Sequence, residues 1–326
     1  MRKKQFISAI VLLILLAIIS FLSRDEDLSG NFKVGDKVFQ NLDPNSINKI
    51  TVSQKTLKQE TVLEKKDNEW LVSNRYEVTA DPALIRQFTD LIKTAEAVHV
   101  VPFKPEDLPL FQLDENSGVK VDIETEGNPV ETFYFGKNHS FSAQSSGRYI
   151  YLPESKAIVL LDKPLSYISA LPSIWLKKYL PFHEEVAAAT LYSDSNIVWK
   201  TERQNAQTPF RMVIPKASEK SPQQIKQLMI YTMQLRFMDI VPAENNFTPD
   251  PQLKKVNLIL QTYDGKIYKL DFLKLVGNQV RCSLKLIANS TNNEFVKSFV
   301  NIDQLKEELS EWHFMVPLAF YEALYK

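Results

Sequence analysis

A repeat at a constant offset of about 140 residues constrains the fold more than any other feature of this sequence. The segment 81–88 (DPALIRQF) aligns with 221–228 (SPQQIKQL), and in the same register 99–102 (HVVP) aligns with 239–242 (DIVP). Segments 81–88 and 221–228 each combine a helix N-cap, a proline at the first helical position and apolar residues at helical spacing. The repeat therefore predicts two copies of one folding unit, each with a long helix that starts at Pro82 or Pro222.

Short strands are predicted around both helices. Before the helices they lie at 50–52, 61–63 and 69–72 in the first unit, and at 190–192, 197–199 and 210–213 in the second. After the helices, apolar residues alternate at 119–123 and 256–260, and turns at Gly127-Asn128 and Asp264-Gly265 lead into further strands, as in β-hairpins. Each unit is expected to end in a short helix, near 163–171 and 303–311.

These elements predict an α+β fold of two tandem, duplicated units, each made of antiparallel strands with a helix packed on one face. The expected boundaries are 46–182 for the first unit and 183–326 for the second. Residues 24–45 are charged and contain Gly30, Gly35 and Pro44, so they are expected to form a tether before the first unit.

The N-terminus predicts a membrane anchor. Arg2, Lys3 and Lys4 precede the uncharged apolar stretch 6–22, which as a helix would span roughly 26 Å of a hydrocarbon core about 30 Å thick. The basic flank places the N-terminus in the cytoplasm. Residues 1–23 are thus expected to be the basic flank and transmembrane helix of a single-pass protein of the cell (inner) membrane, with its bulk extracytoplasmic or periplasmic. A cleaved signal peptide has the same layout, but its apolar run is usually only about 7–15 residues long.

Charge and cysteine content exclude several classes of function. Lys plus Arg and Asp plus Glu number 39 each, so the chain has no net attraction for nucleic acid. Cys282 is the single cysteine, which excludes an internal disulfide and a multi-cysteine zinc site. The four histidines do not have the spacing of a zinc-ligand pair, and no hydrolase or phosphate-loop motif is present. We therefore predict no catalytic residues, no metal and no cofactor.

The most site-like stretch is the polar segment 136–148, which lies between Gly136 and Gly147. We interpret it as a loop on a rigid sheet, where binding residues often lie. The candidate binding residues are Lys137, Asn138, His139, Phe141 and Arg148. The alternative is an ordinary hairpin connection with no binding role.

Two other features leave alternatives open. Adjacent acids occur at 106–107, 114–115 and 307–308, and paired carboxylates are able to serve as general acid and base. The C-terminal segment 312–321 is unusually apolar for a chain end. It is expected either to dock on a partner or membrane, or to be the last part of the core.

Several short stretches resemble one family. They are Leu42-Asp43-Pro44, the strand 47–52, Trp70, Tyr76, Ala80-Asp81, Leu113-Asp114, Phe135-Gly136 and Tyr149-Ile150-Tyr151. With the predicted anchor, they resemble an uncharacterised domain-of-unknown-function family of membrane-anchored proteins encoded beside gliding-motility-type ABC transporters. The resemblance implies an accessory component of an ABC-type export system, with integral-membrane transporter subunits as partners.

Together these features predict a non-enzymatic, membrane-anchored extracytoplasmic accessory or binding component. A groove between two similar units would offer a binding surface. The alternatives are a cell-envelope hydrolase that uses clustered carboxylates, and a structural spacer.

Overall fold

The computed structural model describes eleven stretches of the chain, and every structural statement below concerns these residues alone. They are 32–126, 130–142, 146–163, 165–177, 186–214, 221–233, 235–245, 255–263, 265–275, 279–289 and 311–324. The chain forms two compact units, called unit 1 (Met1–Leu176) and unit 2 (Lys177–Lys326). The described residues are mostly β, with two antiparallel sheets and a few helices, which agrees with the α+β prediction in this coarse sense.

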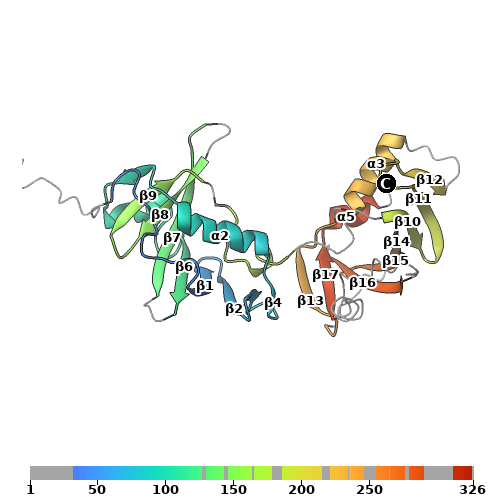
Figure 1. The fold of residues 1–326 in the computed structure, drawn as a ribbon, viewed down its shortest axis with the longest axis horizontal. Coiled ribbons are helices and arrows are strands. Elements are labelled where there is room, and N and C mark those ends of the chain that lie inside the picture. Colours follow the sequence, from blue (N-terminus) through green and yellow to red (C-terminus); the bar gives the residue numbers. More distant parts are fainter. Residues whose placement is uncertain are drawn as a thin grey trace, which may run out of the picture. The chain divides into compact units, whose positions relative to one another are not determined.

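Unit 1 contains a nine-stranded antiparallel sheet in the order β4-β3-β2-β1-β6-β7-β8-β9-β5 (Figure 1). Its strands are β1 (Ile47–Gln54), β2 (Gln59–Lys66), β3 (Glu69–Val72), β4 (Val78–Thr79), β5 (His99–Val101), β6 (Val119–Thr125), β7 (Glu131–Ser140), β8 (Ser146–Leu152) and β9 (Ala157–Leu161). Burial alternates along β6, where Val119, Val121 and Ile123 point into the core. This alternation follows from the two-residue period of a strand that has one covered face.

The long helix of unit 1, α2 (Pro82–Thr94), begins where the sequence predicts. The Asp81 side chain accepts a hydrogen bond from the Ala83 N–H at 2.8 Å, and Pro82 takes the first helical position, where no N–H is needed. The helix buries its apolar stripe, namely Ile85, Phe88, Leu91 and Ile92. Because β4 and β5 lie at opposite edges of the sheet, α2 carries the chain across one face of it (Figure 1).

A second apolar layer packs on part of the sheet of unit 1. The 3₁₀ helix η1 (Pro105–Phe111) lies between two buried side chains, Phe103 and Leu113. These two join a cluster with Tyr149, Ile158 and Leu160 from β8 and β9. All five residues of β9 are buried, as expected for a strand that is covered on both faces.

Unit 2 contains an eight-stranded antiparallel sheet in the order β12-β11-β10-β14-β15-β16-β17-β13 (Figure 1). Its strands are β10 (Val186–Ser193), β11 (Asn196–Glu202), β12 (Arg211–Ile214), β13 (Asp239–Pro242), β14 (Val256–Thr262), β15 (Lys266–Lys274), β16 (Val280–Asn289) and β17 (Trp312–Val316). Its long helix is α3 (Pro222–Met233). The Gln224 side chain accepts from the Ser221 N–H at 2.7 Å and the Ser221 hydroxyl accepts from the Gln224 N–H at 3.3 Å, which is a reciprocal capping box.

The two sheets have the same topology. The order β3-β2-β1-β6-β7-β8-β9-β5 of unit 1 corresponds strand for strand to that of unit 2, and β4 is the additional strand of unit 1 within the described residues. In both units the long helix joins strands at opposite edges. Matching topology is what a duplication predicts, and the sequence repeat falls on equivalent elements in both units.

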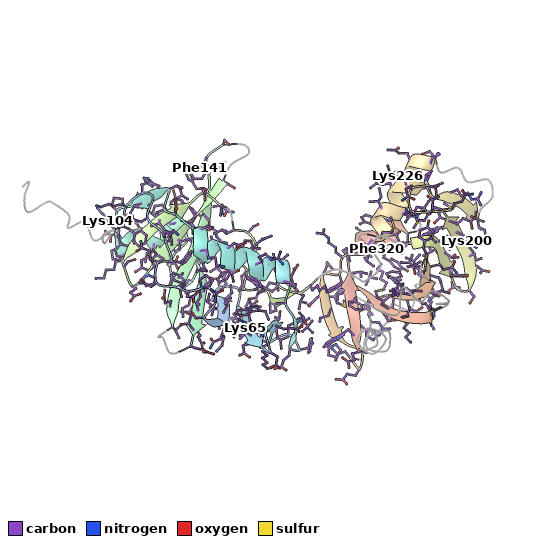
Figure 2. The ribbon with its side chains drawn as sticks, in the orientation of Figure 1. Lys65, Lys104, Phe141, Lys200, Lys226 and Phe320 are labelled. Atoms are coloured by element: carbon purple, nitrogen blue, oxygen red, sulfur yellow. The ribbon has the colours of Figure 1, made fainter. Side chains whose placement is uncertain are left out.

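The apolar C-terminal segment belongs to the core of unit 2. It forms β17 and the helix α5 (Leu318–Ala323), with Phe320, Tyr321 and Leu324 buried (Figure 2). The indole N–H of Trp199 donates to the Leu324 carbonyl at 2.9 Å. Of the two alternatives for this segment, the structure therefore shows the last part of the core.

The short helix expected near 163–171 was wrong. Its described residues contain no helix, and Leu165 has a left-handed backbone with φ of 50°, which interrupts a right-handed helix. A single 3₁₀ turn, η2 (Pro172–Ile174), follows instead. The matching helix expected near 303–311 lies outside the described residues except for Glu311.

Part of the expected tether is folded. Within 24–45, residues 32–45 are described, and Val38, Phe39 and Leu42 are buried in unit 1 because their apolar side chains cover the sheet and helix end. The expected transmembrane anchor, the remaining tether residues 24–31 and the turn at Gly127-Asn128 lie outside the described residues. Within the described part of the chain, no helix is both long and apolar enough to cross a membrane.

Candidate functional site

The loop predicted at 136–148 is a β-hairpin. Strands β7 and β8 pair antiparallel, and the pairing extends to the ends of the strands, where His139 lies opposite Gly147 and Ser140 opposite Ser146. The register shifts between Phe135 and Asn138. Both glycines that suggested the ends of a loop are packed against backbone. A Cβ at Gly136 would lie 2.3 Å from the Phe111 carbonyl oxygen, and one at Gly147 would lie 2.0 Å from the Leu161 carbonyl oxygen. Both glycines are therefore required by the close approach of another backbone segment. The sequence alone does not distinguish such a glycine from one in a loop.

Arg148 points into the core. Its side chain donates to the Gly136 carbonyl at 2.9 Å and to the Leu165 carbonyl at 2.8 Å. Its guanidinium also lies 5.6 Å from the centre of the Phe135 ring. Burial lowers the pKa of Arg148 to about 10. Arg148 therefore anchors the segment around Leu165 to the sheet. It lies opposite the candidate Asn138 in the strand register, but its side chain is buried whereas Asn138 is exposed.

The other four candidates lie at the outer end of the hairpin. Lys137 and Asn138 are exposed, and Phe141 is 45% exposed at the end of β7 (Figure 2). The His139 ring packs edge-on against Phe141, with centroids 5.0 Å apart. The Lys137 ammonium lies 5.3 Å from the centre of the Phe111 ring. These contacts pack the side chains of the hairpin end against one another and against Phe111.

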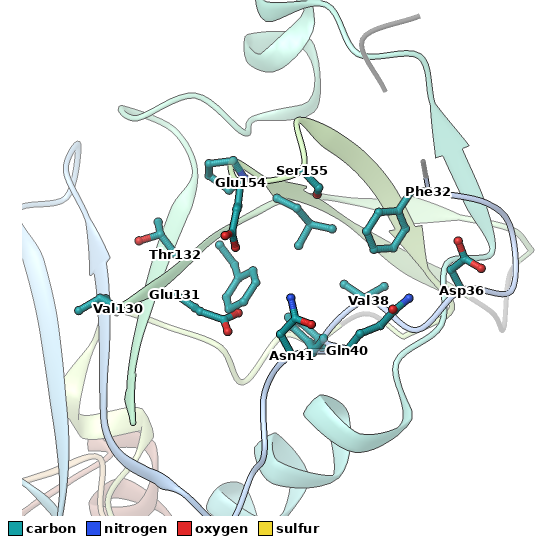
Figure 3. A pocket seen from close by; sticks show the side chains of 14 residues that line it. Phe32, Asp36, Val38, Gln40, Asn41, Val130, Glu131, Thr132, Glu154 and Ser155 are labelled. Carbon is teal, nitrogen blue, oxygen red and sulfur yellow. The ribbon is translucent and has the colours of Figure 1, made fainter. Parts of the chain in front are cut away.

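A cavity of about 840 Å³ lies elsewhere in unit 1, in the view of Figure 3. Three segments that are distant in the sequence line it: the turn-rich segment 32–41, the start of β7 and the connection between β8 and β9. The lining residues are Phe32, Asp36, Val38, Phe39, Gln40, Asn41, Val130, Glu131, Thr132, Phe133, Leu152, Pro153, Glu154 and Ser155. We call this the unit 1 cavity.

Backbone hydrogen bonds hold one wall of the unit 1 cavity. The Gly35 N–H donates to the Ala97 carbonyl at 2.8 Å, and the Val38 N–H donates to the Ala95 carbonyl at 2.9 Å. These bonds tie the segment 32–41 to the chain just after α2. The Phe39 ring then packs edge-on against Phe133, with centroids 4.9 Å apart. The cavity thus has a fixed apolar side.

The polar side of the unit 1 cavity is acidic. The carboxylates of Glu131 and Glu154 project into the space between the three segments (Figure 3). Burial raises the pKa of Glu131, and the negative charge of Glu154 raises it further. Within the described part of the chain, the lining residues include Asp36 as a third acid and no Lys, Arg or His. The cavity therefore combines aromatic surface with excess negative charge.

This arrangement suits ligand binding. Its volume falls in the range of about 300–1,000 Å³ that is usual for small-molecule sites, with apolar walls and a few polar groups. Two carboxylates in one cavity, one of them with a raised pKa, also have the chemistry of a general acid and base. Within the described residues, no group of three or more His, Cys, Asp or Glu side chains is arranged to hold a metal ion.

Two antiparallel sheets of the same topology, each crossed by a helix, define a two-unit α+β protein with a cavity in its first unit. The model of the family described as domain of unknown function (DUF4340) matches residues 70–255, which is more than half of the chain. The protein belongs to this uncharacterised family. The match runs from β3 of unit 1 to the residue before β14 of unit 2, so it crosses the boundary between the units. No curated protein and no solved structure matches the chain.

Sequence reasoning missed the unit 1 cavity. Glu131 and Glu154 are not adjacent, and no motif links them to the segment 32–41, which was interpreted as a tether. The useful signal was the apolar pair Val38-Phe39 within that segment, because buried apolar residues are unusual in a solvated linker.

Proposed function

We propose that this protein is a non-enzymatic, membrane-anchored accessory component that binds a ligand on the outer side of the cell membrane. The unit 1 cavity is the observation that carries the proposal, because it joins a preformed apolar wall to two inward-facing carboxylates. The apolar stretch 6–22 with its basic flank supports the anchor and the outward orientation. An anchor so close in sequence to the cavity would hold the ligand near any integral-membrane partner.

The partner we propose is an ABC-type transporter, as the family resemblance implies. The test is crosslinking of the full chain in intact membranes, followed by affinity purification and mass spectrometry. Recovery of transporter subunits above an anchor-only control (residues 1–31) supports the proposal. Equal recovery with the anchor alone contradicts it.

A second candidate function rests on the same carboxylates. A cell-envelope hydrolase would use Glu131, whose raised pKa suits a general acid, together with the carboxylate group of Glu154. The test is to incubate the full chain with purified cell-envelope polysaccharide and peptide and to search for released fragments. Turnover that Glu131→Gln abolishes would establish the hydrolase and replace the binding proposal.

A further inference from the structure

The charge in the unit 1 cavity is not balanced by its own lining. Asp36 is engaged locally, because its carboxylate accepts from the Lys33 N–H at 2.8 Å. Among the described residues, the side-chain carboxylates of Glu131 and Glu154 make no hydrogen bond or ion pair. Within this part of the chain, no positive side chain therefore neutralises the two carboxylates.

The position of Glu131 is unfavourable for the negative charge of its side chain. Partial burial and the neighbouring Glu154 both disfavour its ionised form, and this is why its pKa is raised. A positive group between the two carboxylates would reverse both effects. It would replace lost hydration with charge-assisted hydrogen bonds and cancel the repulsion between the two acids.

The rest of the lining indicates what kind of cation fits. Phe32 extends its ring into the cavity (Figure 3). Phe39 and Phe133, which pack against each other and also line the cavity, form its aromatic wall. Aromatic faces attract organic cations and pack against apolar bodies. A bare Ca²⁺ or Mg²⁺ ion instead requires about six or more oxygen ligands, which two carboxylates beside phenyl rings do not supply.

We propose that the unit 1 cavity binds an organic cation, namely an amine or guanidinium on an apolar or aromatic body, with Glu131 and Glu154 contacting the positive group. The inference rests on the proposed binding function and names its class of ligand. The aromatic wall contacts the body of the ligand, and the two carboxylates select its charge. Because Glu131 must be ionised to bind, the affinity falls as the pH drops through the raised pKa of this residue.

The test uses three probes that share one fluorescent aromatic body. Dansylcadaverine carries a primary amine, its N-acetyl derivative is neutral, and dansylaminohexanoic acid is an anion. Each is titrated by fluorescence anisotropy into the full chain in phosphatidylcholine nanodiscs, and the signal of empty nanodiscs is subtracted. We expect the dissociation constant of dansylcadaverine to be at least about tenfold lower than that of the neutral probe. Charge-assisted hydrogen bonds are worth about 1.5–3 kcal/mol, which is enough for this difference.

Variants of the lining residues test whether the probes bind in the unit 1 cavity. Glu131→Gln with Glu154→Gln is expected to abolish the preference for the amine and leave the neutral probe unchanged. The matched control, Glu60→Gln with Glu69→Gln, removes the same charge from exposed positions on β2 and β3 and is expected to retain the preference.

Four outcomes overturn the inference. Two concern the native chain: none of the three probes binds, or the amine and the neutral probe bind equally. The other two are an amine preference that survives the double Glu→Gln change, and displacement of the amine by millimolar Ca²⁺ at constant ionic strength. In each case, recovery of transporter subunits in the crosslinking experiment still reports separately on the accessory function.

Discussion

At the residue scale, Arg148 shows how a polar side chain can be structural. Its donors reach carbonyls of two separate segments, Gly136 in β7 and Leu165 after β9. Because small polar residues precede Arg148 in the sequence, we predicted that it belongs to an exposed binding loop. Its orientation is set by the hairpin register, in which Asn138 lies opposite Arg148, and register is not visible in local composition.

Replacement of Arg148 by Met is expected to destabilise unit 1 by about 3 kcal/mol, because two buried carbonyls lose their donor while the apolar volume is kept. Hydrogen exchange read by mass spectrometry provides the measurement. Peptides from 146–168 should exchange faster, and peptides from unit 2 should not change. Lys137→Met is the control, since Lys137 is exposed on the same hairpin. Unchanged exchange in 146–168 would refute the structural role.

His313 makes unit 2 sensitive to acid. Burial lowers its pKa, and the positive charges of Arg281 and Lys285 lower it further. The unfolded chain therefore binds a proton more readily than the folded chain does. The stability is complete above the ordinary histidine pKa of about 6.5 and is lost as the pH falls from there toward the lower folded pKa.

Replacement of His313 by Gln is expected to reduce the loss of stability between pH 7 and pH 5. The measurement is the urea midpoint for exposure of unit 2 at each pH. The matched control is His99→Gln at an exposed position, which should leave the slope of the urea midpoint against pH unchanged. If His313→Gln does not change the slope of the urea midpoint against pH, groups other than His313 cause the loss of stability in acid.

At the element scale, the capped helices and alternating strands were predictable because their signals are local. Asp81 and Ser221 cap α2 and α3 as expected, and β6 and β14 show the predicted alternation. The hairpin of β7 and β8 was predicted only as the alternative to a binding loop, and the packing role of its glycines was not predictable. Gly136 and Gly147 are required by close contacts with η1 and β9, and these contacts join segments that the sequence does not place together.

Gly147→Ala is expected to destabilise unit 1 by about 2–3 kcal/mol, because its Cβ would lie 2.0 Å from the Leu161 carbonyl oxygen and would force the strands apart. Limited proteolysis across a urea series gives the shift in midpoint. Ser146→Ala, on the adjacent residue of β8, should shift it little. Equal midpoints for both variants would mean that β8 and β9 separate easily at this point.

Helix α5 closes the core of unit 2 over β15. The Phe320 ring lies 5.8 Å from Phe272, and Phe272 pairs with Cys282 across β15 and β16. Cys282 is fully buried, which raises the pKa of its thiol and keeps it unreactive. Its reaction with a thiol reagent therefore reports opening of unit 2.

Phe320→Ala is expected to cost about 3–5 kcal/mol and to accelerate labelling of Cys282 at least about 100-fold. The readout is the rate of labelling by a maleimide under native conditions. Glu322→Ala is exposed on the same helix and serves as the control. Similar rates for wild type and Phe320→Ala would contradict the assignment of α5 to the core.

At the scale of the whole molecule, the repeat predicts two duplicated units, and the chain forms two compact units whose sheets have matching strand orders. The unit 1 cavity was beyond sequence reasoning, because segments about 100 residues apart form its walls. Its function as a binding site is the central claim of the account.

The most direct test places the photocrosslinking residue p-benzoylphenylalanine at Val130 in the full chain in living cells. Val130 is 53% exposed and lines the cavity, and Leu57, 55% exposed in the β1–β2 turn, is the matched position outside the cavity lining. We predict a defined adduct from position 130 that is missing from position 57 and lost when Glu131 and Glu154 are both changed to Gln. The same adducts from both positions, or an adduct that is indifferent to the two glutamates, would contradict the account.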